Sequence, residues 1–268
     1  MPEGPEIRRS ADSLARVLQG REVLQVNFAF PHLQEYEARL QGQPITLVES
    51  RGKAMLIHFA DGLRIYSHNQ LYGRWVTHKD SSAPVTNRQI RLSLVTPRGS
   101  AWLLSASDIE VLESEASHPY LSKLGPDPLR PETDATTLLE HWAGPSYSRR
   151  GVAALFLDQN FLAGVGNYLR SEILFVAGVD PHGRLPQDRT ALAHTSIELF
   201  RRSHKTGGQT NDPDLVAQLK ARRWRRRDYR HWVFSRQGQD CHRCGGEIVK
   251  TVLAGRRLYY CPTCQAPG

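Results

Sequence analysis

The spacing of hydrophobic residues changes soon after the chain begins. Four apolar residues recur at helical spacing and predict a helix over residues 5–19: Ile7, Ala11, Leu14 and Leu18. Short β-rich runs separated by turn signals follow, at residues 22–30, 44–50, 53–60, 63–68, 74–78, 88–95 and 100–106. Many short strands at such intervals predict a β-sandwich or barrel rather than a parallel sheet.

The pattern changes again near residue 118. Residues 119–136 contain four prolines and are expected to form a linker. Helical patterns dominate beyond it, over residues 135–142, 151–158, 168–177 and 189–202, and the tail from residue 232 is β-like. The predicted fold class is therefore α+β, with a β-rich N-terminal part followed by a helical part.

The length, charge and hydropathy of the chain narrow its class. No stretch of the 268 residues approaches the roughly 18 apolar residues of a membrane span, and no secretory signal is visible, so a cytoplasmic protein is expected. The net charge is +8, with 17 basic and 17 acidic residues in 1–150 against 18 and 10 in 151–268. The second half is expected to bind a polyanion, although a merely soluble basic face would have the same count.

All four cysteines lie near the C-terminus, in two Cys-x-x-Cys pairs that are sixteen residues apart: Cys241, Cys244, Cys261 and Cys264. Two such pairs predict one four-thiolate Zn²⁺ site of a zinc ribbon, which is structural because no coordination position stays open. Two disulfides or four idle thiols are the alternatives; a reducing cytosol disfavours disulfides, and idle thiols rarely occur in such pairs.

Residues 161–174, FLAGVGNYLRSEIL, place two glycines before the expected start of a helix at Asn167. Asparagine is a preferred N-cap, and glycines at a helix N-terminus let backbone N–H groups approach an anion such as a DNA phosphate. A tight helix–helix turn would use the same residues.

Residues 222–232, RRWRRRDYRHW, interleave six arginines with three aromatic residues. Arginine suits phosphate contacts and aromatic rings stack on bases. The alternative is a solvated, disordered loop, since like charges repel.

The chain opens MPEGPEIRR. If Met1 is removed, Pro2 presents a free secondary amine, which can condense with an aldehyde carbon to give an iminium. Glu3 beside it could transfer protons. With Met1 attached, the nitrogen of Pro2 is an amide and cannot attack, so this chemistry requires processing.

Together these segments resemble the formamidopyrimidine-DNA glycosylase and endonuclease VIII family of base-excision repair enzymes. The match rests on PEGPEIRR, the turn that contains Lys53, residues 161–174 and the cysteine ribbon. Residues 68–75, HNQLYGRW, resemble the endonuclease VIII branch, and the corresponding later loop of the guanine-lesion branch is replaced here by SASDIEVL.

The resemblance implies a bifunctional DNA glycosylase and AP lyase that removes oxidised pyrimidines. It implies catalytic roles for Pro2, Glu3, Lys53 and Glu6, DNA contacts by Gln70, Leu71, Tyr72, Asn167 and Arg256, and zinc ligation by the four cysteines. The partner would be double-stranded DNA with oxidised bases or abasic sites, bound by a bacterial, nucleoid-associated monomer.

The resemblance also implies three domains. These are a β-sandwich catalytic domain over residues 1–125, a helix-two-turn-helix domain over 126–225 and a zinc ribbon over 226–268. A non-catalytic protein that binds damaged DNA through its zinc ribbon remains the alternative function, with an RNA-binding zinc-ribbon protein as a third.

Overall fold

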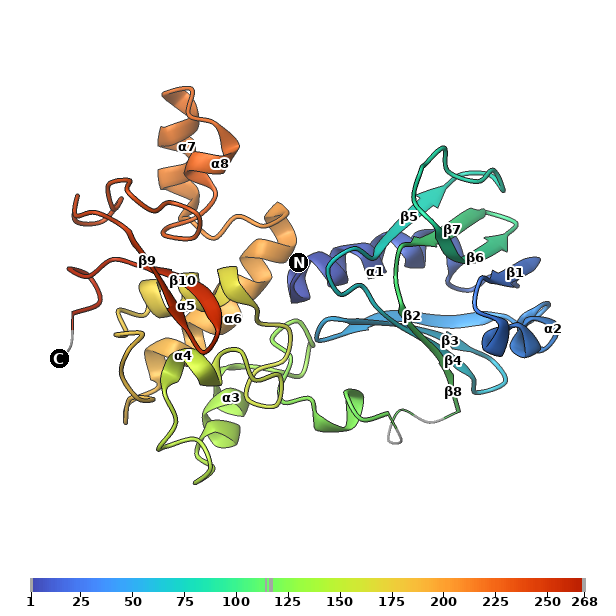
Figure 1. Ribbon diagram of the computed structural model, residues 1–268, viewed down its shortest axis with the longest axis horizontal. Coiled ribbons are helices and arrows are strands. Elements are labelled where there is room, and N and C mark those ends of the chain that lie inside the picture. The colour runs from blue at the N-terminus through green and yellow to red at the C-terminus, as the bar shows by residue number, and fades with distance from the viewer. Residues whose placement is uncertain (1, 114, 116–117, 267–268) are drawn as a thin grey trace. The chain divides into compact units, whose positions relative to one another are not determined.

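A computed structural model describes residues 2–113, 115 and 118–266, so Met1 lies outside the described residues. The chain forms two compact units, Met1–Lys123 and Leu124–Gly268. Figure 1 shows the strands gathered in the first unit and most of the helices in the second. The α+β fold class predicted from the sequence is confirmed.

The first unit is a β-sandwich with a leading helix, α1 (Gly4–Leu18). Its two antiparallel sheets have the strand orders β1-β6-β7-β5 and β2-β3-β4-β8. The strands are β1 (Gln25–Phe28), β2 (Ile45–Arg51), β3 (Ala54–Phe59), β4 (Arg64–His68), β5 (Arg74–His78), β6 (Ile90–Thr96), β7 (Gly99–Leu104) and β8 (Asp108–Leu112). Short helical segments are η1 (Pro31–Tyr36), α2 (Glu37–Leu40) and η3 (Leu121–Lys123).

Helix α1 forms part of the hydrophobic core of the first unit. The four apolar residues that predicted the helix are buried, and they pack with the inner residues of both sheets in one hydrophobic cluster. Burying each of the three larger side chains, Ile7, Leu14 and Leu18, stabilises the fold by about 1.5–3 kcal/mol. Helix α1, which begins only four residues into the sequence, is therefore fixed by packing.

The second unit contains helices α3 (Ala135–Trp142), α4 (Val152–Leu155), α5 (Asn167–Val176), α6 (Thr190–Thr206), α7 (Pro213–Ala221) and α8 (Arg226–Tyr229), and the hairpin of β9 (Val249–Leu253) and β10 (Arg256–Tyr260). The buried ring of Trp142 stacks on Phe161 with a centroid separation of 4.7 Å. Helix α5 is buried along most of its length.

The sequence did not predict one of the strands, and it left open whether the arginine-rich segment is ordered. Strand β8 falls in SASDIEVL, which carried no strand prediction, and it pairs with β4 while burying Ile109 and Leu112. The arginine-rich segment contains the short helix α8 and directly follows α7, and the two helices contribute Val216, Leu219 and Tyr229 to a small apolar cluster. The domain boundaries at residues 125 and 225 stay predictions.

Candidate active site and nucleic-acid interface

The first candidate catalytic residues lie at the N-terminus of α1. Glu3 is the N-cap residue, and the backbone N–H of Glu3 donates to Oε2 of Glu6 at 3.0 Å, in the arrangement of a capping box. Glu3 is 3% exposed, whereas Pro2 and Glu6 are partly exposed. Pro2 is thus followed directly by Glu3, a buried residue whose backbone N–H is held by the carboxylate of Glu6.

Lys53 lies in the two-residue turn between β2 and β3, with Gly52 in the left-handed region at φ 58°. The backbone N–H of Lys53 donates to the hydroxyl of Tyr120 at 2.9 Å, and Lys53 is 8% exposed. Burial of a lysine at a hairpin tip is unusual, because solvent normally surrounds such a charge. Its burial therefore distinguishes Lys53 from ordinary surface lysines.

His68 at the end of β4 is electrostatically linked to Lys53. Burial lowers the pKa of His68 below its ordinary value, the carboxylate of Asp108 opposes this shift, and the ammonium group of Lys53 adds to it. The ring of Tyr120 packs edge-on against His68, with a centroid separation of 5.6 Å. Lys53, His68 and Tyr120 thus form one cluster of titratable groups in the first unit.

The connection from β4 to β5 crosses between the two sheets and presents the predicted wedge. Leu71 is 64% exposed and Tyr72 is 71% exposed. Gln70 adopts φ 48°, and its side-chain Oε1 accepts a hydrogen bond from the hydroxyl of Ser107. Packing therefore does not explain why Leu71 is apolar, which supports its interpretation as a wedge.

The loop before α5 is fixed by a glutamine that the sequence analysis did not identify. Oε1 of Gln159 accepts from the N–H of Gly164, and its Nε2 donates to the carbonyl of Val165, each at 2.9 Å. The N-cap of α5 is Gly166, not Asn167, which occupies the first helical position. Asn167 is therefore not the cap residue, and it is half-buried.

Buried Arg170 on α5 connects the helix to the ribbon hairpin. Its guanidinium donates to the carbonyls of Leu253, Arg256 and Arg257 at 3.0–3.2 Å, and also to that of Ala153. Arg170 lies about one turn after Asn167 on α5, and its guanidinium donates to the carbonyl of Arg256, so one buried side chain connects the two elements that carry Asn167 and Arg256. Arg256 itself is exposed.

A second buried charge on α5, Glu172, fixes the segment that leads into the ribbon. Its carboxylate accepts backbone N–H groups of Trp232, Val233 and Phe234 and the hydroxyl of Thr210. Burial raises the pKa of Glu172, and these hydrogen bonds oppose that shift. The only local signal for Arg170 and Glu172 was their position inside an otherwise apolar helix.

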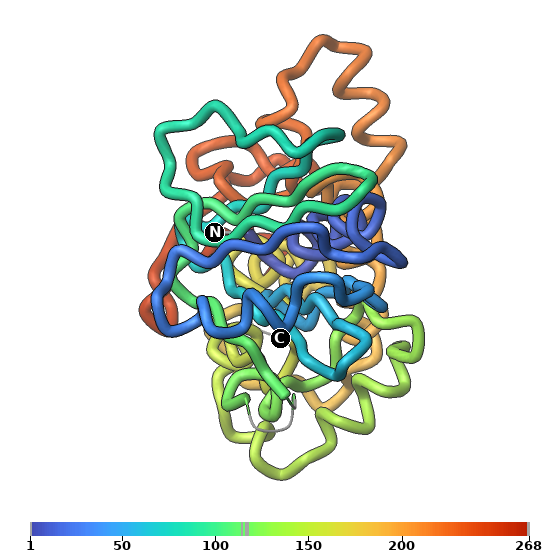
Figure 2. Tube along the Cα trace, turned by 90° about the vertical axis from the view of Figure 1, so that its right-hand side faces the viewer, coloured from blue at the N-terminus to red at the C-terminus, as the bar shows by residue number. Residues whose placement is uncertain are grey.

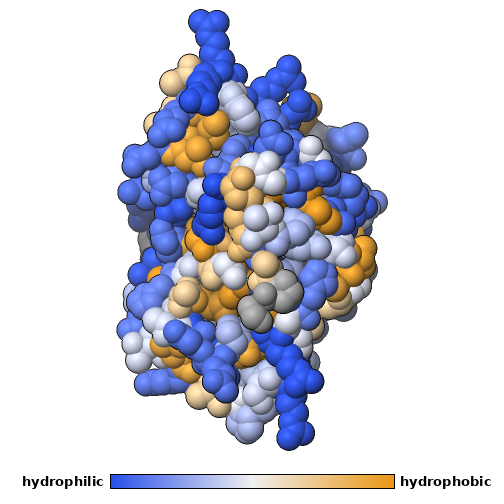
Figure 3. Space-filling view, turned by 90° about the vertical axis from the view of Figure 1, so that its left-hand side faces the viewer, coloured by the Kyte–Doolittle hydropathy of each residue, from blue (hydrophilic) through white to orange (hydrophobic). Residues whose placement is uncertain are grey.

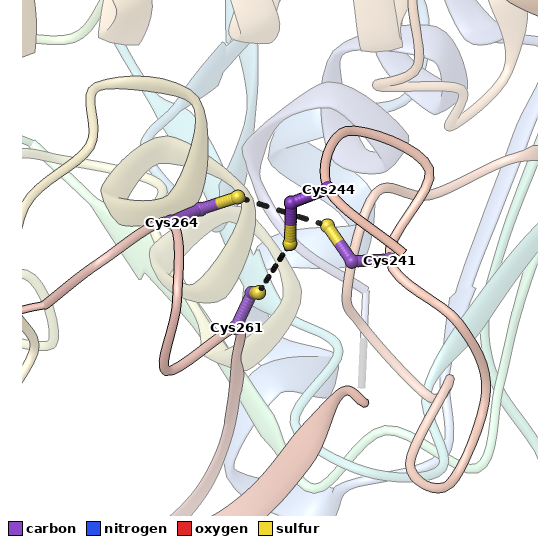
Figure 4. Close-up of side chains that lie close together, drawn as sticks. All are labelled: Cys241, Cys244, Cys261 and Cys264. Atoms are coloured by element: carbon purple, nitrogen blue, oxygen red, sulfur yellow. Dashed lines mark hydrogen bonds between the residues drawn. The ribbon is translucent and has the colours of Figure 1, made fainter. Parts of the chain in front are cut away.

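The four cysteines meet at one point, with their sulfurs turned toward each other (Figure 4). The Sγ atoms of Cys241 and Cys264 are 3.9 Å apart, and those of Cys244 and Cys261 are 3.5 Å apart. A tetrahedral Zn²⁺ with bonds of about 2.3 Å places its sulfurs about 3.8 Å apart, so the thiolates fit this ion. Disulfide bonds would require a separation of about 2.05 Å.

The predicted site residues thus fall into two groups. Pro2, Glu3, Glu6, Lys53 and the wedge at Gln70, Leu71 and Tyr72 lie in the first unit; Asn167, Arg256 and the cysteines lie in the second. Tyr120, Gln159, Arg170 and Glu172 are additional residues that support these groups.

Three family models match successive parts of the chain. They are the formamidopyrimidine-DNA glycosylase N-terminal domain over residues 1–106, its H2TH domain over 124–211, and a zinc finger found in FPG and IleRS over 238–267. Proteins called Endonuclease 8 from Escherichia coli O6:K15:H31 (strain 536 / UPEC) and from Shigella flexneri serotype 5b (strain 8401) are 44% identical over 99% of this chain and their full length. The chain belongs to the formamidopyrimidine-DNA glycosylase and endonuclease VIII family.

Solved structures agree with this family fold. The Lactococcus lactis Fpg in complex with DNA containing an abasic site matches with a TM-score of 0.77 and 23% identity, over 99% of this chain and all of that one. The wild-type form of that enzyme, in complex with DNA containing an oxidised pyrimidine, matches over the same shares of both chains with a TM-score of 0.78 and 23% identity.

This family member is a base-excision repair DNA glycosylase with AP lyase activity, and it carries one structural zinc ion. No helix within residues 2–113, 115 and 118–266 is long and apolar enough to cross a membrane.

Proposed function

We propose that this glycosylase removes oxidised pyrimidines from duplex DNA, using Pro2 as the nucleophile, and then cleaves the strand by β- and δ-elimination. The observation that carries the proposal is the buried carboxylate of Glu3, held at the N-terminus of α1 directly after Pro2. The relatives called Endonuclease 8 and the Gln70-Leu71-Tyr72 loop support pyrimidine lesions as the main substrates.

The chemistry begins with the amine of Pro2 after removal of Met1. The nitrogen lone pair bonds to C1′ of the deoxyribose as the glycosidic bond breaks, and the base leaves with a proton from an acid. The bound amine loses its proton, the C1′–O4′ bond breaks and O4′ takes up a proton, which opens the sugar ring and leaves an iminium between C1′ and the nitrogen. This iminium makes the C2′ proton acidic. Loss of that proton expels the 3′ phosphate, and a second elimination expels the 5′ phosphate, leaving a one-nucleotide gap.

Glu3 would supply the proton. A carboxyl group that is 3% exposed and next to the nucleophile can protonate the opening sugar or the departing base. Glu6 contributes through the backbone, since its carboxylate accepts the N–H of Glu3 and so fixes the Pro2–Glu3 segment. We therefore assign Glu6 a positioning role.

Lys53 would bind a phosphate that flanks the lesion and assist proton transfer. Lys53 is buried and its backbone N–H donates to the hydroxyl of Tyr120, so the residue has a fixed place in the turn, which supports this role. A phosphate would replace the solvation that burial removes.

Damaged bases inside a duplex are out of reach, so the nucleotide must be flipped out. The exposed Leu71 and Tyr72, with Gln70, would fill the gap in the stack. Asn167 and Arg256 would hold the phosphates on either side of the lesion, and Arg170 keeps their two elements together.

The decisive experiment is borohydride trapping on thymine-glycol and abasic duplexes, with mass spectrometry of the reduced adduct. We expect the cross-link at Pro2 and intact-mass loss of Met1. P2G should weaken the trap, and E3Q should abolish base excision while retaining much of the DNA binding. A cross-link at Lys53 or another residue would refute the proposed nucleophile.

The alternative, a non-catalytic protein that binds damaged DNA through its zinc ribbon, predicts binding without any adduct. We also propose that the protein acts as a monomer associated with the bacterial nucleoid through DNA, and that its domains divide at residues 125 and 225. Sedimentation of the free protein and of the DNA complex tests the first of these points, and limited proteolysis tests the last.

A further inference from the structure

Helices α7 and α8 form an arm, residues 213–230, that stands clear of the other helices of the second unit in both ribbon and tube views (Figures 1 and 2). These residues contain seven cationic side chains and two acidic ones, in a chain whose net charge is +8. More than half of the excess positive charge of the protein therefore lies on this short arm.

The guanidinium groups at the turn between the two helices have no partners within the part of the chain that the structure describes. Arg222, Arg223 and Arg225 are exposed, and among the described residues no hydrogen bond or ion pair involves their side chains. Arginines elsewhere pair with carboxylates, as in Arg8–Asp12 at 3.1 Å and Arg150–Asp158 at 2.8 Å. In Figure 3, hydrophilic side chains form most of the upper edge of the visible face, at the level of α7 and α8 in Figure 1, with a smaller hydrophobic patch among them.

The arm is ordered although its charges repel each other. Val216, Leu219 and Tyr229 form its apolar cluster, and the ammonium group of Lys220 lies 5.4 Å from the centroid of the Tyr229 ring. Helix α7 ends in a Schellman motif, in which the N–H of Trp224 donates to the carbonyl of Leu219.

The turn after α7 keeps a charged residue where glycine is easier. Arg223 adopts φ 60°, a left-handed conformation that costs an L-residue roughly 1 kcal/mol. Keeping arginine there places one more guanidinium at the turn, at the expense of folding stability. A solvated face without a ligand gains nothing from this arrangement.

The base of the arm is fixed to the proposed DNA-binding elements. Asn211 Nδ2 donates to the carbonyl of Tyr229, and the N–H of Thr210 donates to that of Arg230. The hydroxyl of Thr210 is in turn held by Glu172, five residues after Asn167 on α5. At the turn, the ring of Trp224 packs against His242 of the first zinc knuckle, with centroids 5.8 Å apart.

We propose that the arm is an additional clamp for the DNA backbone, in which Arg222, Arg223 and Arg225 each bind a phosphate of the duplex beyond the lesion. This inference rests on the proposed function for the presence of DNA, but not on the chemistry at Pro2. Duplex DNA is favoured over an acidic protein because the arm is anchored to α5 and the zinc ribbon, which hold the proposed phosphate contacts Asn167 and Arg256.

The experiment measures how the affinity depends on salt. The probe is a duplex with a tetrahydrofuran abasic analogue that extends more than one helical turn on each side. R222Q/R223Q/R225Q should lower the slope of log K against log salt by about 2–3, because each phosphate contact contributes about 0.9. Between about 50 and 200 mM salt, wild-type binding should thus weaken about 40-fold more than binding by the variant.

Two control variants separate contact from net charge. R21Q/R39Q/R98Q removes the same charge from exposed positions of the first unit and should change the slope little. R222K/R223K/R225K keeps the charge and should retain most of the slope. Circular dichroism should show that the glutamine variant keeps its helices.

The single-turnover excision rate at saturating enzyme should be unchanged in the glutamine variant. An unchanged slope would overturn the inference, as would an equal loss in the control from the first unit. If the glutamine variant had a lower slope only for single-stranded RNA of the same length, and not for the duplex, the inference would also be overturned. If the wild-type protein gave no borohydride adduct, the proposed function would be refuted instead. The salt slope would still test whether the arm binds DNA.

Discussion

The guanidinium of Arg170 donates from Nη2 to the carbonyl oxygen of Arg256 at 3.2 Å, so a buried charge on α5 shapes the turn of the ribbon hairpin. Arg256 is the first residue of β10 and follows a turn in which Ala254 and Gly255 both have positive φ. The exposed cation of the hairpin is therefore positioned from inside the protein.

Replacing Arg170 should separate the ribbon from α5. R170M leaves buried carbonyl groups without donors and should lower the free energy of unfolding by about 3 kcal/mol, with faster release of zinc to a chelator. R170K can satisfy fewer carbonyls and should be intermediate. Unfolding by denaturant and a chromophoric chelator measure the two effects; unchanged zinc release in R170M would contradict the assigned role.

Replacing Leu71 should slow excision without destabilising the fold. Because Leu71 is 64% exposed, L71A should change the free energy of unfolding by less than about 0.5 kcal/mol. Single-turnover excision from duplex DNA should fall about tenfold or more, since the cost of unstacking is a few kcal/mol. L24A, at a leucine that is 51% exposed, is the matched control and should excise normally.

Removing zinc should affect the second unit far more than the first. Zinc binding is coupled to folding in such small ribbons, so chelation should destabilise the C-terminal segment and weaken DNA binding. Hydrogen exchange should accelerate over residues 238–265 and stay unchanged in β2 and β3. Full protection of the ribbon after complete zinc removal would show that the ion is not structural.

The cluster of Lys53 and His68 predicts a pH effect of defined sign. The pKa of His68 is lowered in the folded protein, so the unfolded chain binds more protons, and this group destabilises the fold as pH falls below about 6.5. K53M removes a neighbouring positive charge and should raise the pKa of His68. NMR titration of the imidazole measures the shift.

The matched control for that titration is K79M, which removes a lysine from an exposed position of the same unit. It should leave the midpoint of His68 unchanged. If both variants shift the midpoint equally, the effect comes from net charge, and the local link between Lys53 and His68 is refuted.

Sequence reasoning succeeded where local spacing decides the structure. The apolar stripe of α1 and the two Cys-x-x-Cys pairs are patterns that lie within one short segment. The helix and the four-cysteine cluster that they predict are both confirmed. It failed for contacts between distant segments. Tyr120 reaches the backbone of Lys53 across 67 positions, and Glu172 reaches Val233 across 61, and no local pattern signals either contact.

The arginine-rich arm shows a different limit. Repulsion between its charges left a disordered loop open as an alternative, and Tyr229, beyond most of the arginines, supplies the apolar partner that Val216 and Leu219 need. The structure of the arm therefore depends on Tyr229, an apolar contact that counting the charges of the segment does not reveal.

The loop between β4 and β5, which carries Gln70, Leu71 and Tyr72, is tightly closed, and this has a consequence for engineering. The N–H of Gly73 donates to the carbonyl of Asn69 at 2.7 Å, and a Cβ at position 73 would lie 2.6 Å from backbone atoms of Asn69. Libraries intended to alter lesion preference can randomise positions 71 and 72, whose side chains face solvent, but should keep glycine at 73. Any larger residue there would reshape the loop itself and obscure what the varied side chains do.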